Sequence, residues 1–61
     1  MKQETAEARR RLRLAENAKE RQDFETARYH ANKGLGALGR PWYPSLPAEE
    51  LIRMLSAALG R

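Results

Sequence analysis

The chain contains no cysteine and only one histidine. Without cysteine there is no disulfide and no zinc site of the cysteine-containing kinds, and the composition fits a reducing compartment. The single histidine, His30, has no Asp or Glu three or four residues away on either side. A metal site would need ligands from distant segments. We therefore expect no metal and no other cofactor in this chain.

Long apolar runs are also missing. No stretch approaches the roughly 20 apolar residues that span a bilayer, and the N-terminal MKQETAEARRR is charged where a secretory signal peptide is apolar. We expect a cytoplasmic protein with no membrane partner. An interfacial membrane helix near the C-terminus is the alternative, but its polar face carries two Glu and one Arg, whereas membrane surfaces attract basic faces.

Groups suited to catalysis are few. No hydroxyl side chain has a local base or a nucleophile motif; the Ser and Thr residues are Thr5, Thr26, Ser45 and Ser56. No carboxylate pair lies in apolar surroundings, as a raised pKa would require. The glycines of residues 34–39 have G-x-G-x-x-G spacing, but a predicted helix precedes them and a Pro-rich segment follows, unlike a dinucleotide-binding unit. We expect no enzymatic activity.

Large apolar side chains are scarce for a chain of 61 residues, which has eight Leu and four aromatic side chains. A chain this short buries a smaller fraction of its surface than an ordinary domain does. We expect one small helical domain over residues 1–61, with residues 1–4 frayed. We also expect extra burial, by self-association as a homodimer or against another protein.

Apolar residues recur at helical spacing. In residues 22–38 they form one narrow stripe of mostly small side chains, which lets a partner helix approach closely; its members are Phe24, Ala27, Ala31, Leu35 and Leu38. We predict an all-α fold with a helical hairpin, about 5–21 and 23–38, and a third helix, about 46–59. One bent helix over 5–38 is the alternative, because the two stripes differ by only about 40 to 60°.

The sequence QDFETA at residues 22–27, followed by Lys33, Gly34 and Leu35, resembles the turn and second helix of a tetratricopeptide repeat, whose motif contains Gly-Asp-Tyr-x-x-Ala. The resemblance covers about residues 11–41, a single unit, and implies a helical hairpin. Gln22 stands where the motif has glycine. A three-helix arrangement similar to microtubule-interacting-and-transport domains is the alternative.

Residues 40–47, RPWYPSLP, separate the second and third predicted helices and contain all three prolines. Proline fixes φ and removes a backbone donor, so we expect an extended, stiff connector. The only tryptophan, Trp42, lies in it. Trp42 either covers the open end of the hairpin as the main aromatic of the core, or is exposed as an anchor for a partner.

The chain is basic, with a formal net charge of +4. Its first predicted helix carries the cluster RRRLR at residues 9–13. Three of these arginines spread over about 100° of the outer face, while Arg11 lies at the edge of the apolar face. Either this face is solvated or it binds an anionic partner. The candidate nucleic-acid contacts are Arg9, Arg10, Arg13 and Arg21.

We therefore predict a small non-enzymatic α-helical module that self-associates and binds or regulates another protein. The predicted partner-binding residues are Arg28, Tyr29, Lys33, Trp42 and Tyr43, because they lie on the flank of the second helix and in the connector. The alternative is a basic helical nucleic-acid-binding protein that uses the Arg-rich first helix. The small size also suits an accessory protein of a phage or plasmid.

Overall fold

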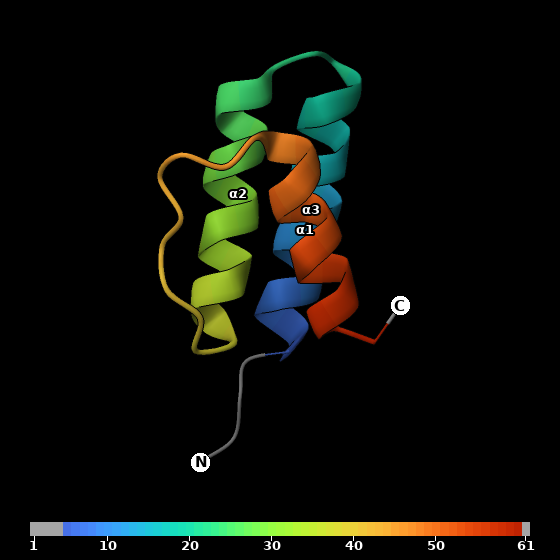
Figure 1. The fold of residues 1–61 in the computed structure, drawn as a ribbon. Coiled ribbons are helices and arrows are strands. Elements are labelled where there is room, and N and C mark those ends of the chain that lie inside the picture. Colours follow the sequence, from blue (N-terminus) through green and yellow to red (C-terminus); the bar gives the residue numbers. More distant parts are fainter. Residues whose placement is uncertain (1–4, 61) are drawn as a thin grey trace.

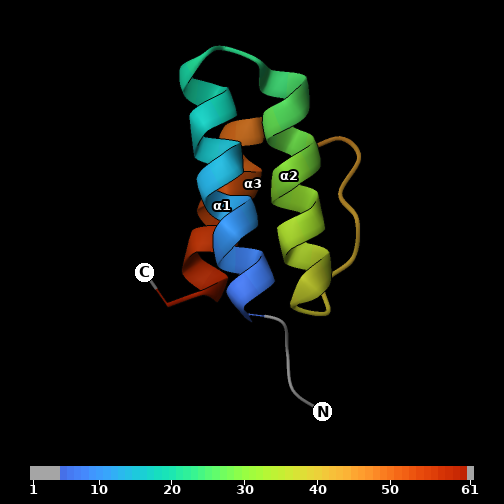
Figure 2. The same cartoon turned by 180° about the vertical axis from the view of Figure 1, so that it is seen from behind.

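The computed structural model describes residues 5–60, which form three α-helices and no strand: α1 (Thr5–Glu20), α2 (Phe24–Ala37) and α3 (Ala48–Ala58). The predicted all-α hairpin with a third helix is confirmed, and the predicted fraying of residues 1–4 lies outside the described residues. α1 and α2 are antiparallel, and α3 packs across one side of the pair (Figures 1 and 2). Within residues 5–60, no helix combines the length and the apolar composition needed to cross a bilayer.

The chain reverses between α1 and α2 because two adjacent residues end one helix and begin the next. Gln22 has a φ of 62°, and the N–H groups of Gln22 and Asp23 donate to the carbonyls of Lys19 and Ala18, both at 2.9 Å. This is the Schellman arrangement that ends a helix. The Asp23 side chain then accepts from the Thr26 N–H at 3.4 Å and caps α2. One bent helix over 5–38 is therefore excluded.

Gln22 is a glutamine in a conformation that favours glycine, so Gln22→Gly should stabilise the protein. The left-handed region costs an L-residue about 1–2 kcal/mol, and glycine's extra freedom in the unfolded chain offsets part of the gain. We expect the free energy of unfolding to rise by about 0.5–1 kcal/mol, measured by urea denaturation. Gln22→Ala is the control, because alanine keeps the steric cost. A glycine variant no more stable than the alanine variant would contradict the account.

The buried faces of α1 and α2 consist largely of alanine. Five alanines are fully buried: Ala8, Ala15 and Ala18 in α1, and Ala27 and Ala31 in α2. Small side chains allow two helices to approach closely, as the predicted stripe required. The larger core side chains complete the packing against α3; those fully buried are Leu12, Leu35, Leu51 and Leu55.

Gly34 lies where the three helices meet. A Cβ atom there would lie 2.7 Å from Leu55 Cδ2 and 3.1 Å from Arg11 Cβ, whereas a Cβ at Gly36 would meet nothing within 4 Å. Gly39 ends α2 with a φ of 84°, and the Arg40 N–H donates back to the Leu35 carbonyl at 2.9 Å. Gly34 therefore serves helix packing, and Gly39 serves helix termination.

Phe24 departs from the predicted stripe, because its side chain is 52% exposed. Phe24 is the first residue of α2, beside the turn. The last buried residue of α1 is Ala18, and the residues that follow it, Lys19 and Glu20, are exposed. Phe24 is therefore not part of the buried stripe, because α1 offers no buried residue beyond Ala18 at that end of the hairpin.

Candidate protein-binding surface

The connector of residues 40–47 runs back along α2 and is attached to it (Figure 1). Asn32 of α2 is 2% exposed and uses its whole amide on one residue. Its Nδ2 donates to the Tyr43 carbonyl at 3.1 Å, and its Oδ1 accepts from the Tyr43 N–H at 3.0 Å. One turn earlier in α2, Arg28 Nη2 donates to the Pro44 carbonyl at 3.0 Å. Two consecutive connector residues are thus fixed to α2.

These attachments decide what two of the predicted partner-binding residues do within the chain. The Arg28 guanidinium holds Pro44, and Tyr43 contributes its backbone to Asn32 while its half-buried side chain packs against the core. The sequence prediction missed Asn32. The available signal was an asparagine inside a predicted helix, where it is unfavourable unless its amide finds a partner.

The other three predicted residues come together on the connector side of α2. The Tyr29 and Trp42 rings meet edge to face, with centroids 6.2 Å apart and an interplanar angle of 63°. They are 48% and 51% exposed. Lys33 Nζ lies 6.0 Å from the centroid of the Tyr29 ring, and the guanidinium carbon of Arg11 lies 5.9 Å from it. We call Arg11, Tyr29, Lys33 and Trp42 the aromatic surface.

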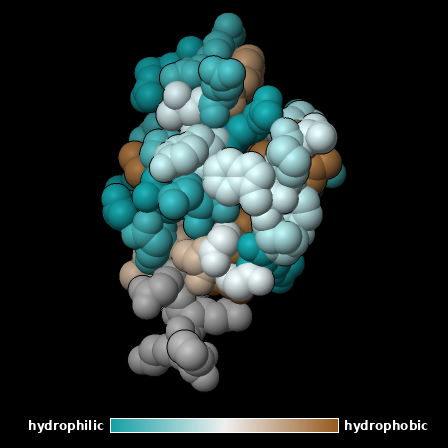
Figure 3. All heavy atoms as spheres, turned by 90° about the vertical axis from the view of Figure 1, so that its left-hand side faces the viewer, coloured by the Kyte–Doolittle hydropathy of each residue, from teal (hydrophilic) through white to brown (hydrophobic). Residues whose placement is uncertain are grey.

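Trp42 therefore does not serve as the main aromatic of the core. It lies against Tyr29 on the flank of α2 because Asn32 holds the next residue, Tyr43, against the helix. Figure 3 shows this side of the molecule, where residues of intermediate hydropathy form a pale area among hydrophilic ones. Of the two alternatives for Trp42, the structure shows the exposed position.

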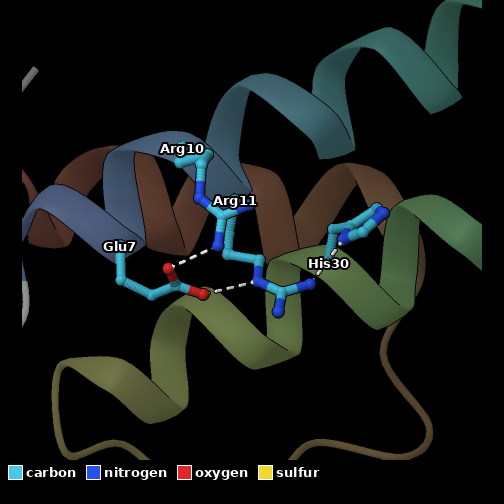
Figure 4. Close-up of polar contacts among 4 residues, drawn as sticks. All are labelled: Glu7, Arg10, Arg11 and His30. Atoms are coloured by element: carbon cyan, nitrogen blue, oxygen red, sulfur yellow. Dashed lines mark hydrogen bonds and ion pairs between the residues drawn. The ribbon is translucent and has the colours of Figure 1, made fainter.

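Arg11 reaches the aromatic surface from α1 and is held by two neighbours (Figure 4). Its Nε donates to Glu7 Oε2 at 2.8 Å, and its Nη1 lies 3.0 Å from His30 Nδ1. Glu7 Oε1 also pairs with Arg10 Nη2 at 2.6 Å. The Arg11 side chain is only 18% exposed, as expected for an arginine at the edge of the apolar face. The sequence did not reveal the contact with His30, which is nineteen residues away.

The charges of this cluster shift two pKa values. The hydrogen bond from Arg11, followed by that from Arg10, lowers the pKa of the Glu7 carboxyl. Burial lowers the pKa of His30, and the positive charges of Arg11 and Arg10 lower it further. His30 is therefore neutral at pH 7, with Nδ1 able to accept from the Arg11 guanidinium.

The lowered pKa of His30 predicts a pH-dependent stability. Between the folded-state pKa and the ordinary value of 6.5, the unfolded chain binds more protons than the folded chain, so acid favours unfolding. We expect the free energy of unfolding to fall as the pH drops below about 6.5, measured by urea denaturation across this range. His30→Gln should remove this component because the chain has no other histidine. The same slope in both proteins would contradict the account.

The candidate nucleic-acid contacts are only partly assembled. Arg9, Arg10 and Arg13 are exposed on α1 and, with Glu16, line an open depression of about 490 Å³. Arg21 follows the end of α1, about 12 Å further along than Arg13 at a rise of about 1.5 Å per residue. The structure thus brings together three of the four predicted arginines, one of which already pairs with Glu7.

In the part of the chain that the structure describes, no three His, Asp or Glu side chains are arranged to hold a metal ion. Comparisons of the chain with family models, curated proteins and solved structures found no match. The aromatic surface is the feature that joins side chains of α1, α2 and the connector in defined contacts.

Proposed function

We propose that this chain is a small non-enzymatic helical module that binds another protein through the aromatic surface. The observation that carries the proposal is the Tyr29–Trp42 pair, which is half exposed and held in place by the attachment of the connector to α2. Tyr, Trp and Arg are the residue types enriched at binding hot spots. A surface fixed before binding also loses less conformational entropy on association.

The exposed area of the two rings is large enough to matter for affinity. A fully buried aromatic side chain covers about 150–250 Å², so burying the remaining half of each ring contributes about 2–3 kcal/mol at about 25 cal/mol per Å². Two such rings beside one another match the small number of residues that dominate a typical interface.

The resemblance of residues 11–41 to a tetratricopeptide repeat remains a prediction, supported by the hairpin and by the positive φ of Gln22.

The test compares proteins captured from a nuclease-treated cell lysate by three tagged chains. These are the wild type, the double variant Tyr29→Ala/Trp42→Ala, and Phe24→Ala. Phe24 is the matched control because it is also an exposed aromatic of α2, but lies at the hairpin turn. We expect the wild type and Phe24→Ala to capture the same proteins and the double variant to lose them. Equal capture by all three would contradict the proposal.

We also propose that the chain self-associates through the side of α1 and α3 away from the connector. Glu16, Lys19, Ile52 and Arg53 contribute to an open depression of about 370 Å³ there. Both signs of charge on one surface suit a two-fold contact, in which each patch meets its own copy. We expect a dimer at micromolar concentration in sedimentation equilibrium and a folded monomer for Arg53→Glu, because Arg53 is exposed whereas Ile52 is buried in the core. A folded wild-type monomer would contradict self-association.

Nucleic-acid binding is the second candidate, because Arg9, Arg10 and Arg13 line one depression on α1. Binding through phosphate contacts predicts an affinity for duplex DNA that falls with salt, with a log–log slope near −0.9 for each contact. The double variant Arg9→Gln/Arg13→Gln should reduce that slope. Absence of binding to duplex or single strands at about 50 mM salt would exclude this candidate.

A further inference from the structure

The aromatic surface carries positive charge that the described residues do not neutralise. Lys33 is exposed, and in residues 5–60 no carboxylate lies within 4.0 Å of its Nζ. Beside the rings is an open depression of about 380 Å³, and among residues 5–60 Glu7 is the only acidic residue that lines it. Glu7 already pairs with both Arg10 and Arg11. An anionic group in the depression would therefore meet the positive charge of Lys33 and the part of the Arg11 charge that Glu7 does not neutralise.

The same depression offers an apolar floor next to these charges. Trp42, Ala37 and Gly36 line it together with Lys33 and Arg11. Gly36 has nothing within 4 Å of its would-be Cβ, so this stretch of α2 is open to an approaching chain. A ligand that fits must bring an apolar group and a negative charge within a few ångströms of each other.

The arrangement disfavours two other occupants. In a two-fold dimer formed through this surface, Lys33 and Arg11 of one copy would face Lys33 and Arg11 of the other, and such like-charge contacts cost free energy. A single-stranded nucleic acid needs open ring faces on which bases stack. The Arg11 guanidinium and the Lys33 ammonium lie about 6 Å from the centroid of the Tyr29 ring, and Tyr29 and Trp42 meet edge to face rather than as parallel platforms.

We propose that the aromatic surface binds an acidic segment of a partner protein. An apolar side chain of the segment packs against Trp42, and an adjacent Asp or Glu carboxylate pairs with Lys33 and accepts from Arg11 Nη2, the guanidinium nitrogen that contacts neither Glu7 nor His30. Charge complementarity of this kind steers association and selects among partners. This inference rests on the proposed protein-binding function and adds the chemistry of the partner.

The test starts from a phage-displayed library of random dodecapeptides, selected on the folded wild-type chain and counter-selected on Tyr29→Ala/Trp42→Ala. We expect the enriched peptides to carry Asp or Glu next to an aromatic or large aliphatic residue. Replacing those acidic residues by Asn or Gln in a synthetic peptide should weaken binding about tenfold. The affinity of the acidic peptide should also fall as salt is raised.

Two charge reversals locate the effect on the protein. Lys33→Glu and Arg21→Glu change the net charge equally, but Arg21 is exposed in the turn that follows α1, away from the aromatic surface. We expect Lys33→Glu to weaken binding of the acidic peptide about tenfold and Arg21→Glu to leave it nearly unchanged. Equal loss in both variants would overturn the proposal, since it would reflect net charge alone.

The remaining outcomes separate the inference from the proposed function. Enriched peptides that lack acidic residues but still require Tyr29 and Trp42 would overturn the acidic chemistry and leave the protein-binding function standing. A selection that yields no peptide dependent on Tyr29 and Trp42 would overturn both. Displacement of the peptide by an oligothymidine of similar length, at equal concentration, would assign the surface to single-stranded nucleic acid and overturn the proposal.

Discussion

Gly34→Val should lower the free energy of unfolding by about 3 kcal/mol or more, whereas Gly36→Ala, two residues along the same helix, should raise it by about 1 kcal/mol. Both glycines lie inside α2, where glycine itself costs about 1 kcal/mol relative to alanine. The opposite signs come from the space around each Cβ. Urea denaturation followed by circular dichroism measures both changes.

The steric reason for the effect at Gly34 is that neither neighbour can move easily. A Cβ there would lie 2.7 Å from a methyl carbon of Leu55, which is fully buried, and 3.1 Å from the Cβ of Arg11, which is fixed to the backbone of α1. Relief therefore requires α1 or α3 to shift. Gly34→Ala should be intermediate, with a loss of about 1–2 kcal/mol after the gain in helix propensity.

A loss of about 3 kcal/mol is a large part of the free energy of unfolding of a chain of this size, since domains are stable by roughly 0.05–0.15 kcal/mol per residue. Gly34→Val should therefore be substantially unfolded in mild denaturant. Equal stabilisation of the protein by Gly34→Ala and Gly36→Ala would contradict the claim that the three helices pack closely at Gly34.

Asn32→Ala should lower the free energy of unfolding by about 2–3 kcal/mol and release the connector from α2. The substitution removes two hydrogen bonds to Tyr43, each worth about 1 kcal/mol, and leaves part-buried backbone groups without their partner. Trp42 is the only tryptophan, so quenching of its fluorescence by acrylamide reports the release. We expect quenching to increase in Asn32→Ala under conditions where the helices remain folded.

Asn17→Ala is the control for this prediction, because Asn17 is an exposed asparagine in α1. It should change the free energy of unfolding by no more than about 0.5 kcal/mol and leave quenching of Trp42 unchanged. Asn32→Ala with wild-type stability and wild-type quenching would show that Asn32 does not hold the connector.

The helices could be predicted from the sequence because their signals are local. The alanine and leucine spacing gave the buried faces, and Asp23 and Gly39 gave helix ends that agree with the structure. At Gln22 the signal was only its place at the glycine position of the repeat motif, since a glutamine with positive φ looks like an ordinary helical residue in sequence. Phe24 was misplaced because spacing gives the direction of a side chain but not the extent of the opposite helix.

The candidate site was only partly predictable, because its contacts join residues with no common period. Helical spacing correctly predicted that Tyr29 and Lys33 lie together on the flank of α2, since they are four residues apart on one helix. Trp42 is placed by the hydrogen bond from Asn32 to the backbone of Tyr43 in the connector. Arg11 of α1 is placed by its contact with His30 of α2. No spacing rule covers such contacts.

The emission of Trp42 during a binding titration tests the central claim most directly, because a single tryptophan reports on one place in the molecule. Addition of a peptide selected on the wild-type chain should shift the emission to shorter wavelengths and protect Trp42 from acrylamide, since the partner replaces water over the exposed half of the ring. Binding that leaves both the emission and the quenching of Trp42 unchanged would place the interaction elsewhere and contradict the account.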